Sequence, residues 1–426
     1  MDKAIVTQDL LSFIHEGATP WHAAEHIAAR LIEKGFQELQ EQEVWNLEAG
    51  KSYFIVREGA VVAWRNPHQK PLSAKILGAH TDSPCLKVKP NPESLDHDMT
   101  FLLVEPYGSP ILTSWLNRDL YLAGRILFED GSGNFKEKLL KLEENPLIIP
   151  SVALHLDRSL NEKSYALDKQ KHLAPLADIE GSPYLLPLLQ EKASGRAILD
   201  FDLMLVPKEA PNLVGRHKQL IASHRIDNLA GVHSALHALL YSGPAKDTLH
   251  MAAFYNAEEI GSKTYDGADG PILQDALKRI CLANQLREEE YFGLKSRSLM
   301  ISVDAAHGYH PSFQEKYDPN HVPLLGKGPV FKYSAQQRYT TTARSAALLI
   351  DLCRKHHLPF QKFVTHSNIP AGSTIGPISA SKLGISSVDI GIAELSMHSV
   401  REIMAAEDQA IMCKLLTAFF GDQGHG

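Results

Sequence analysis

GAHTDSP, at residues 78–84, is the segment from which the architecture of this chain can be worked out. It follows the apolar run AKIL at residues 74–77, which predicts a short buried strand ending at the glycine and alanine. His80 would then lie at the carboxyl edge of a sheet, where open α/β sheets bind ligands. Because alternate residues of an extended segment share a side, Asp82 could orient the His80 imidazole while its other nitrogen binds a metal. On its own, the pair is more typical of a histidine held by a turn aspartate.

Composition and charge exclude several classes of protein. A chain of 426 residues with 44% hydrophobic and 22% charged residues is typical of a soluble globular protein of roughly two or three domains. The net charge of -7 and the lack of a long basic run argue against a nucleic-acid partner. Four cysteines without CxxC spacing exclude a thiolate zinc site and a disulfide framework. Because the sequence shows no secretory leader and no apolar run of about 18 residues, we expect a cytoplasmic protein without a membrane partner.

Two regions that differ in composition and in the periodicity of their apolar residues predict two domains. Residues 5–42 show two amphipathic helical patterns, and residues 227–241 carry apolar side chains at helical spacing, with short apolar strands between such helices. This alternation predicts an α/β domain with a three-layer α/β/α arrangement. In residues 88–217, prolines, turn clusters and short strands replace the helical periods, which predicts an inserted β-rich domain. The α/β domain would therefore be discontinuous and formed by residues 1–87 and 218–426.

Residues of metal-ligating type follow other predicted strands of the α/β domain. Glu258 and Glu259 come directly after one apolar strand pattern, and Asp304 comes after another. His398 lies in the loop that follows the last predicted strand. Asp227 lies at a predicted helix start, where unpaired backbone amides favour a carboxylate. The sequence thus predicts several acidic and histidine side chains at one edge of the sheet.

Five of these side chains could together coordinate two divalent ions. The candidate ligands are His80, Asp227, Glu259, Asp304 and His398. Their mixture of imidazole and carboxylate groups suits zinc. Two ions about 3.5–4 Å apart need a bridging carboxylate, and such pairs serve aminopeptidases and phosphatases. Asp227 is the natural bridge.

The adjacent glutamates in NAEEIGS need separate roles, because neighbouring side chains at a strand end cannot both face one metal. We assign Glu259 to a metal and Glu258 to the attacking water, as general base and then as the acid for the leaving amine. Each residue alone has a plainer interpretation. Paired glutamates could form a solvated face, Asp304 could belong to a turn and His398 to a helix terminus. The hypothesis depends on the whole set.

Eight sequence blocks carry a resemblance to a known family. They are GAHTDSP (78–84), RIDN (225–228), NAEEIGS (256–262), SVDAAHGYHP (302–311), KGPVFK (327–332), QRY (337–339), GSTIGPI (372–378) and MHSVRE (397–402). In their order, and over essentially the full chain, they resemble the aspartyl aminopeptidases, a family of di-zinc metallopeptidases. The resemblance implies a metallopeptidase catalytic domain, the five ligands named above with Asp227 bridging, Glu258 as the catalytic carboxylate and Asp82 behind His80.

The resemblance also implies an assembly. The inserted domain would mediate dimerisation, and the dimers would form a tetrahedral dodecamer whose active sites face an interior chamber. His155, in VALHLDR, would reach the active site of the neighbouring subunit. From the residues alone, a strand histidine paired locally with Asp157 is the simpler interpretation.

Fewer residues bear on substrate preference. Family members that favour an amino-terminal aspartate or glutamate have a lysine at the position of Lys332, whose ammonium could pair with an acidic side chain. A solvated lysine on a strand edge is the alternative. His307 and His310 could line the same pocket, although either could be structural.

We therefore expect a co-catalytic aminopeptidase that acts on peptides with a free amino terminus and prefers aspartate or glutamate there. It would hold two Zn2+ per subunit, with Mn2+ or Co2+ able to substitute. The alternatives are an aminopeptidase of neutral or broad preference, a related metal-dependent deacylase or carboxyl-end peptidase, and a metal-stabilised scaffold without catalysis. Retention of both Glu258 and Glu259 argues against the scaffold.

Overall fold

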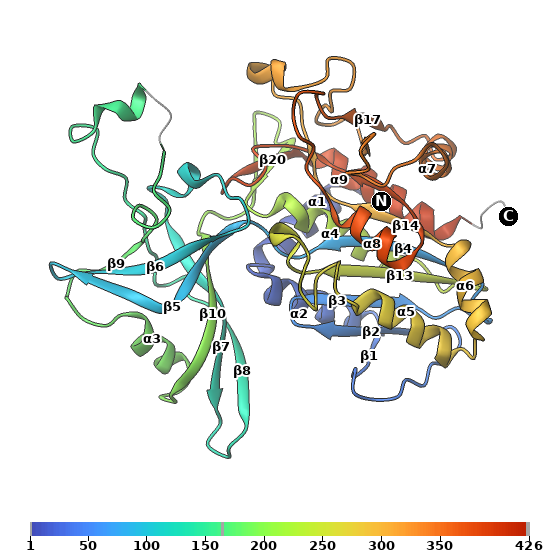
Figure 1. Cartoon of the computed structure of the whole chain (residues 1–426), viewed down its shortest axis with the longest axis horizontal. Helices are drawn as coiled ribbons and strands as arrows, with labels where there is room; N and C mark the ends of the chain where they lie inside the picture. Colours follow the sequence, from blue (N-terminus) through green and yellow to red (C-terminus); the bar gives the residue numbers. More distant parts are fainter. Residues whose placement is uncertain (1, 163–165, 423–426) are drawn as a thin grey trace. The chain divides into compact units, whose positions relative to one another are not determined.

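The computed structural model describes residues 2–162 and 166–422 of the chain (Figure 1). Contacts divide it into two compact units. The first comprises the described residues of Met1–Asp82, Pro211–Met397 and Glu402–Gly426, and the second comprises those of Ser83–Ala210 and His398–Arg401. Both borders of the inserted segment lie a few residues before the predicted 88 and 217, and the short stretch that begins with His398 belongs to the same unit.

A nine-stranded sheet lies at the centre of the first unit (Figure 1). In order across the sheet, its strands are β1 (Gln37–Glu38), β2 (Ser52–Arg57), β3 (Ala60–Arg65), β13 (Thr248–Tyr255), β4 (Ser73–His80), β14 (Leu299–Val303), β18 (Ser386–Gly391), β16 (Val330–Tyr333) and β17 (Gln361–Val364). The central strands β13, β4, β14 and β18 are parallel, whereas β3 and β16 pair antiparallel to them. Because parallel strands end at the same edge, β4, β13 and β14 deliver their following residues to one place.

Helices cover both faces of this sheet. One face packs against α1 (Lys3–Glu16), α2 (Pro20–Glu33), α4 (Ile226–Tyr241), α7 (Ala343–Lys355) and α9 (Ala406–Gly421). The other face packs against α5 (Ile272–Ala283), α6 (Glu288–Ser296) and α8 (Ile375–Leu383). Alternate residues of β4 serve the two layers, since Leu77 and Ala79 belong to the first cluster and Ala74 and Ile76 to the second. The predicted three-layer α/β/α arrangement is confirmed.

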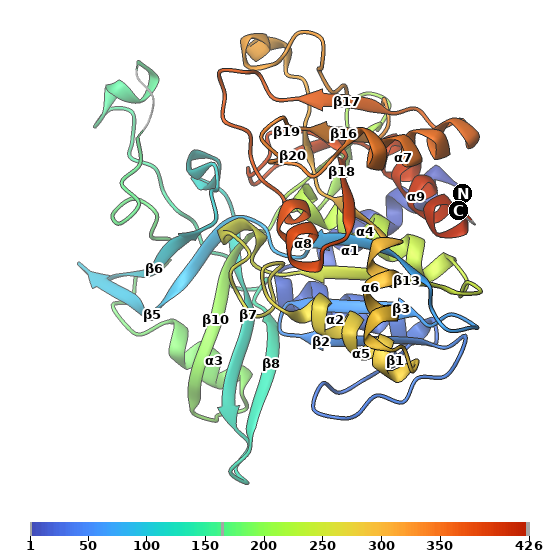
Figure 2. The same cartoon turned by 45° about the vertical axis from the view of Figure 1, so that its right-hand side comes forward.

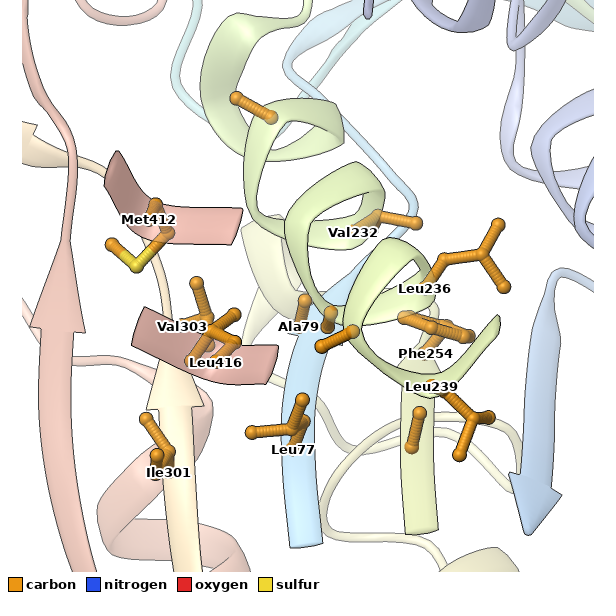
Figure 3. Packing of buried hydrophobic residues seen from close by; sticks show 14 of the residues in the cluster. Leu77, Ala79, Val232, Leu236, Leu239, Phe254, Ile301, Val303, Met412 and Leu416 are labelled. Atoms are coloured by element: carbon orange, nitrogen blue, oxygen red, sulfur yellow. The ribbon is translucent and has the colours of Figure 1, made fainter. Parts of the chain in front are cut away.

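Figure 3 shows how the first of these layers packs. The strands contribute Leu77, Ala79, Phe254, Ile301 and Val303, α4 contributes Val232, Leu236 and Leu239, and α9 contributes Met412 and Leu416. All of these side chains are at most 1% exposed. Burying an aliphatic side chain of this size contributes about 1.5–3 kcal/mol, so the layer holds α4 firmly over the sheet. The start of α4 is thereby fixed near the strand ends.

The first unit also contains a five-stranded sheet that the sequence did not predict. Its strands, in order, are β11 (Asn212–Val214), β12 (Leu220–Ser223), β20 (Glu402–Ala405), β19 (Ala393–Leu395) and β15 (Ala306–His307). These short strands join segments that are far apart in the sequence. The sheet is relevant to the candidate site because β15 follows Asp304, and β19 and β20 each carry a buried glutamate.

The second unit consists mostly of antiparallel β structure (Figure 2). In order across its sheet, the strands are β8 (Phe135–Lys141), β7 (Leu120–Glu129), β10 (Ile198–Pro207), β5 (Cys85–Asp96), β6 (Met99–Tyr107) and β9 (Leu176–Asp178). The helix α3 (Leu185–Lys192) buries Leu185 and Leu189. This content agrees with an inserted β-rich domain. Across both units, no helix in the described part of the chain is long and apolar enough to cross a membrane.

Candidate active site

Four predicted site residues of the first unit, His80, Glu258, Glu259 and Asp304, follow or end strands at the carboxyl edge of the central sheet. His80 ends β4 and pairs with Tyr255, the last residue of β13. The 3-10 turn Glu258–Ile260 follows β13 after two residues, and Asp304 follows β14 directly. The strand order therefore brings these side chains to one edge although they are far apart in the sequence.

The imidazole of His80 is buried among three carboxylates. Its Nδ1 lies 3.3 Å from Oδ1 of Asp82 and 3.1 Å from the Asp82 carbonyl oxygen. Its Nε2 lies 3.4 Å from Oδ1 of Asp227 and 3.6 Å from Oδ1 of Asp304. Burial alone would lower the pKa of His80, but Asp227, Asp304 and Asp82 together raise that pKa well above its ordinary value. The surroundings of Nε2 therefore favour a positive charge.

Asp82 connects His80 to the two glutamates. Its side chain is fully buried, and its Oδ1 accepts a hydrogen bond from the amide N–H of Glu258 at 3.1 Å. Its Oδ2 accepts one from the amide N–H of Glu259, also at 3.1 Å. The carboxylate thus fixes the turn that carries both glutamates while it touches the imidazole, which is a positioning role.

Three residues of the described chain form a group that could hold a metal ion, namely His80, Asp227 and Glu259, whose ligand atoms all lie within 4.8 Å of one another. Asp304 adjoins this group through its contact with His80. Imidazole and carboxylate ligands in this combination suit zinc. Four of the five predicted ligands therefore lie together in the first unit.

The fifth predicted ligand, His398, belongs by its contacts to the second unit. Its Nδ1 lies 3.0 Å from the carbonyl oxygen of Ser109, and its own carbonyl oxygen accepts a hydrogen bond from the amide of Ile111. Both contacts are local to that unit. The assignment of His398 as a metal ligand stays a prediction.

Asp227 precedes the regular part of α4, which differs from the expectation that it sits in a helical first turn. Asp227 and Asn228 have non-helical backbone angles, so regular helix begins after them. The amide of Asp227 donates to Oε2 of Glu402 at 3.1 Å, and the side-chain amide of Asn228 donates to the carbonyl of Val303 at 2.8 Å. These bonds fix the turn against β20 and the end of β14.

Glu258 lies among the same charges. Burial is the main reason that its pKa is raised to about 8, the carboxylates of Asp304, Asp82 and Asp227 add to the effect, and His80 opposes it. A carboxyl group with a pKa near neutrality can both take up and return a proton. The position and chemistry of Glu258 suit the general base and acid predicted from the sequence.

Lys332 is buried beside this group, so the solvated alternative for it is wrong. Its side chain is 3% exposed, and its Nζ donates to the carbonyl of Ala305 at 3.0 Å and lies 3.7 Å from Oδ2 of Asp304. The ring of Tyr339 has its centroid 5.2 Å from Nζ. Burial would lower the pKa of Lys332, but Asp304 and its acidic neighbours raise it overall, so the ammonium stays charged.

Two further histidines of the first unit show local contacts. His307 is exposed on β15, and its ring centroid lies 6.1 Å from that of Phe363. His310 accepts a hydrogen bond from the amide of Ser312 at 3.3 Å through Nδ1, which caps the 3-10 segment that follows. This contact gives His310 a structural role, whereas the exposed ring of His307 remains a candidate for substrate binding.

His155 is exposed in the second unit and lies in a turn, not on a strand. The turn is closed by the amide of Leu156, which donates to the carbonyl of Ala153 at 2.9 Å. Asp157 accepts hydrogen bonds from the amide and hydroxyl of Ser159 at 3.0 and 2.7 Å. The local partner that the sequence suggested for His155 is thus engaged elsewhere.

Two glutamates near the site were missed by the sequence analysis. Glu402 is fully buried and, as described above, accepts the amide of Asp227. Glu394 is 1% exposed, and neither of its carboxylate oxygens has a hydrogen-bond partner among the described residues. The pKa of Glu394 is raised well above its ordinary range, mainly by burial and further by Glu402 and other acidic neighbours. An acidic residue in the short apolar segment at 392–395 was the one available signal for Glu394.

Comparison with known proteins identifies the family. The sequence matches the family described as Aminopeptidase I zinc metalloprotease (M18) over residues 13–420. The chain belongs to the M18 family. The resemblance carried by the eight sequence blocks is thereby confirmed, and this M18 chain is a zinc metallohydrolase that acts on peptides as an aminopeptidase.

Relatives of this M18 chain match it over almost their full length. It is 39% identical over 423 residues to a probable M18 family aminopeptidase 2 of Streptomyces avermitilis, with 97% of each chain covered. A solved structure described as the Ape4 and Nbr1 complex has a TM-score of 0.94 and 32% identity, over 98% of this chain and 86% of that one. The S. cerevesiae mApe1 dodecamer has a TM-score of 0.84 and 25% identity, over 98% and 96%.

Proposed function

We propose that this M18 enzyme works with two zinc ions per subunit and removes amino-terminal aspartate or glutamate from peptides. The observation that carries the proposal is that His80, Asp227, Glu259 and Asp304 meet beside Glu258. Asp227 would be shared between the ions, and His398 would complete the ligand set. Mn2+ or Co2+ would be able to substitute, because geometry and availability rather than ligand type select among such metals.

The residues present suit divalent cations. The carboxylates of Asp227 and Asp304 lie near Nε2 of His80 and that of Asp82 near Nδ1, and together they favour positive charge on this imidazole. When bound, zinc supplies Lewis acidity towards the carbonyl group of the scissile bond. Asp82 orients His80 and the turn of the two glutamates, so the ligand atoms are held in place before substrate arrives.

Glu258 would carry out the proton transfers. As the base it takes a proton from the attacking water, and as the acid it returns that proton to the leaving amine. Its raised pKa, caused mainly by burial, suits both steps at neutral pH. The hydrogen bond from its amide to Asp82 keeps its backbone fixed throughout.

Lys332 would favour an acidic amino-terminal residue. Its ammonium is buried and charged, and a buried cation discriminates strongly between acidic and neutral side chains. His307 would line the same pocket from β15, and we retain His310 there only as a candidate because of its capping bond. A neutral or broad preference is the alternative outcome.

The inserted unit would mediate dimerisation, and dimers would assemble into a tetrahedral dodecamer. Support comes from the dodecamer formed by S. cerevesiae mApe1 and from exposed apolar residues around His155, namely Val152, Leu154 and Leu156. In such an assembly His155 would contact substrate in the neighbouring subunit. A cytoplasmic location is also proposed, and it fits four cysteines that are buried and form no disulfide.

A panel of peptides that differ only in the amino-terminal residue tests the function, assayed with added zinc, manganese or cobalt. The expected result is release of amino-terminal aspartate and glutamate, with no release when the amino group is acetylated. Equal rates on alanine peptides would show a broad preference. Equal activity without any divalent metal would contradict the proposed zinc chemistry.

A further inference from the structure

Glu394 occupies a defined position beside the candidate site. It lies on β19, and its Cα is the register partner of His307 on the parallel strand β15. Its carbonyl oxygen accepts a hydrogen bond from the amide of Gly308 at 2.7 Å. Since β15 begins two residues after Asp304, the pairing holds Glu394 next to the segment that carries this candidate ligand.

The carboxylate of Glu394 has no partner within the described chain. Both oxygens are inaccessible to solvent and make no hydrogen bond there. Its strongest charged neighbours are all acidic, in the order Glu402, Asp227, Asp304 and Glu259. A carboxylate buried among other carboxylates is costly without a cation or a set of donors. Metal ions bound by Asp227, Asp304 and Glu259 would offset charge but donate no hydrogen bonds, so the Glu394 oxygens still lack the donors that an ammonium group would supply.

The other carboxylates around the site already accept backbone hydrogen bonds, pair with a lysine or belong to the candidate metal group. Asp82 accepts two backbone amides, and Glu402 accepts the amide of Asp227. Asp227 and Glu259 belong to the candidate metal group. Asp304, next to His80, is also 3.7 Å from the ammonium of Lys332. Glu394, by contrast, is a buried acid of this cluster without a role in metal binding or proton transfer.

We propose that Glu394 accepts the α-ammonium group of the substrate. This inference rests on the site given under the proposed function, because an aminopeptidase must distinguish a free amino terminus from a blocked one. An ammonium group offers three N–H donors and a full charge, and charge-assisted hydrogen bonds in a dry site are strong. A blocked terminus would leave Glu394 buried without its cation, which provides discrimination against internal peptide bonds.

The test compares two small ligands on the zinc-loaded enzyme by calorimetry. Alanine hydroxamate carries the α-ammonium group, whereas propanehydroxamic acid has the same skeleton without it. Glu394→Gln keeps the shape of the side chain but removes its charge. We expect this variant to bind alanine hydroxamate about 10- to 100-fold more weakly and propanehydroxamic acid within about twofold of wild type. Glu315→Gln, which alters an exposed glutamate of the same unit, should bind both ligands as wild type does.

Each other outcome has a definite meaning. Equal weakening of both ligands, a fall in zinc content of Glu394→Gln, or unchanged binding of alanine hydroxamate would overturn the assignment. If Glu394→Gln does not fold, Glu394→Asp carries the test, because it withdraws the carboxylate by one methylene and must show a loss confined to the amino-bearing ligand. If wild type itself binds both ligands equally, the proposed site does not recognise the amino group at all, and this outcome is distinct from failure of Glu394 alone.

Discussion

The two units of this chain use β structure in different ways. The first encloses a mostly parallel sheet between two helical layers, so polar side chains at its strand ends are buried, as for His80, Asp82 and Asp304. The second is antiparallel and leaves much of its strands exposed, and β8 buries Leu140 alone. Burial of charge shifts pKa values and prepares chemistry, whereas exposed surface is available to partners. We therefore propose that the first unit carries catalysis and that the second mediates assembly.

Substitution of Glu258 should cause the largest loss of activity. Glu258→Gln keeps the shape of the side chain but removes the group that moves the proton, so kcat should fall about 10²- to 10⁴-fold with zinc content unchanged. Steady-state kinetics and metal analysis on the same sample check this. Glu259→Gln is the matched comparison and should lose zinc instead. Near wild-type turnover in Glu258→Gln would remove catalysis from this edge of the sheet.

A subunit-mixing experiment tests the role given to the second unit. His155→Ala should lower kcat/KM by about tenfold or more, because a substrate contact would be lost. Co-expression with Glu258→Gln should restore activity, since a mixed dimer combines one intact Glu258 with His155 of the partner subunit. With random pairing, about a quarter of the sites should be active. Activity no greater than the average of the two parents would show that His155 does not act between subunits.

Lys332 tests whether the first unit also sets specificity. Lys332→Met removes the buried charge, so kcat/KM for an amino-terminal aspartate relative to alanine should fall about 10-fold. Lys327→Met, which alters an exposed lysine a few residues before it, should leave this ratio unchanged. A proportional loss of kcat/KM on both substrates would mean that Lys332 supports Asp304 and does not contact the side chain of the amino-terminal residue.

The smallest expected change is in the stability of the first unit, where the contribution of His250 is lost only as the pH falls. His250 is buried against the ring of Phe420 at 4.6 Å, and burial, with the nearby charge of Lys75, lowers the pKa of His250 to about 4. Because the unfolded chain has the higher pKa of about 6.5, it binds the proton first, so stability falls as pH drops from about 6.5 to 4, by about 3 kcal/mol in all.

His250→Phe should remove this part of the acid loss while it preserves ring packing. Urea unfolding at pH 7 and pH 4.5 measures it, and the difference between the two pH values should be smaller in the variant. Phenylalanine in place of the exposed His155 serves as the control. An unchanged difference in His250→Phe would show that other groups cause the acid sensitivity.

The sequence was sufficient where a local pattern and a general rule of sheets combine. Apolar runs followed by His80, Glu258 and Asp304 predict strand ends, and parallel strands bring such ends together. The sequence was insufficient where the position of a residue depends on pairing between distant segments. The burial of Lys332 depends on β16 lying between β18 and β17, and the position of Glu394 depends on β15, β19 and β20 meeting. Neither is visible in the local sequence.

The most direct test of the account is the zinc content of active protein, measured together with turnover of an amino-terminal aspartyl peptide. The account predicts two zinc ions per subunit in wild type, and a parallel loss of zinc and activity in Asp227→Asn, since Asp227 would be shared between the ions. Full activity in protein that contains no divalent metal, or a fully active Asp227→Asn variant, would contradict it.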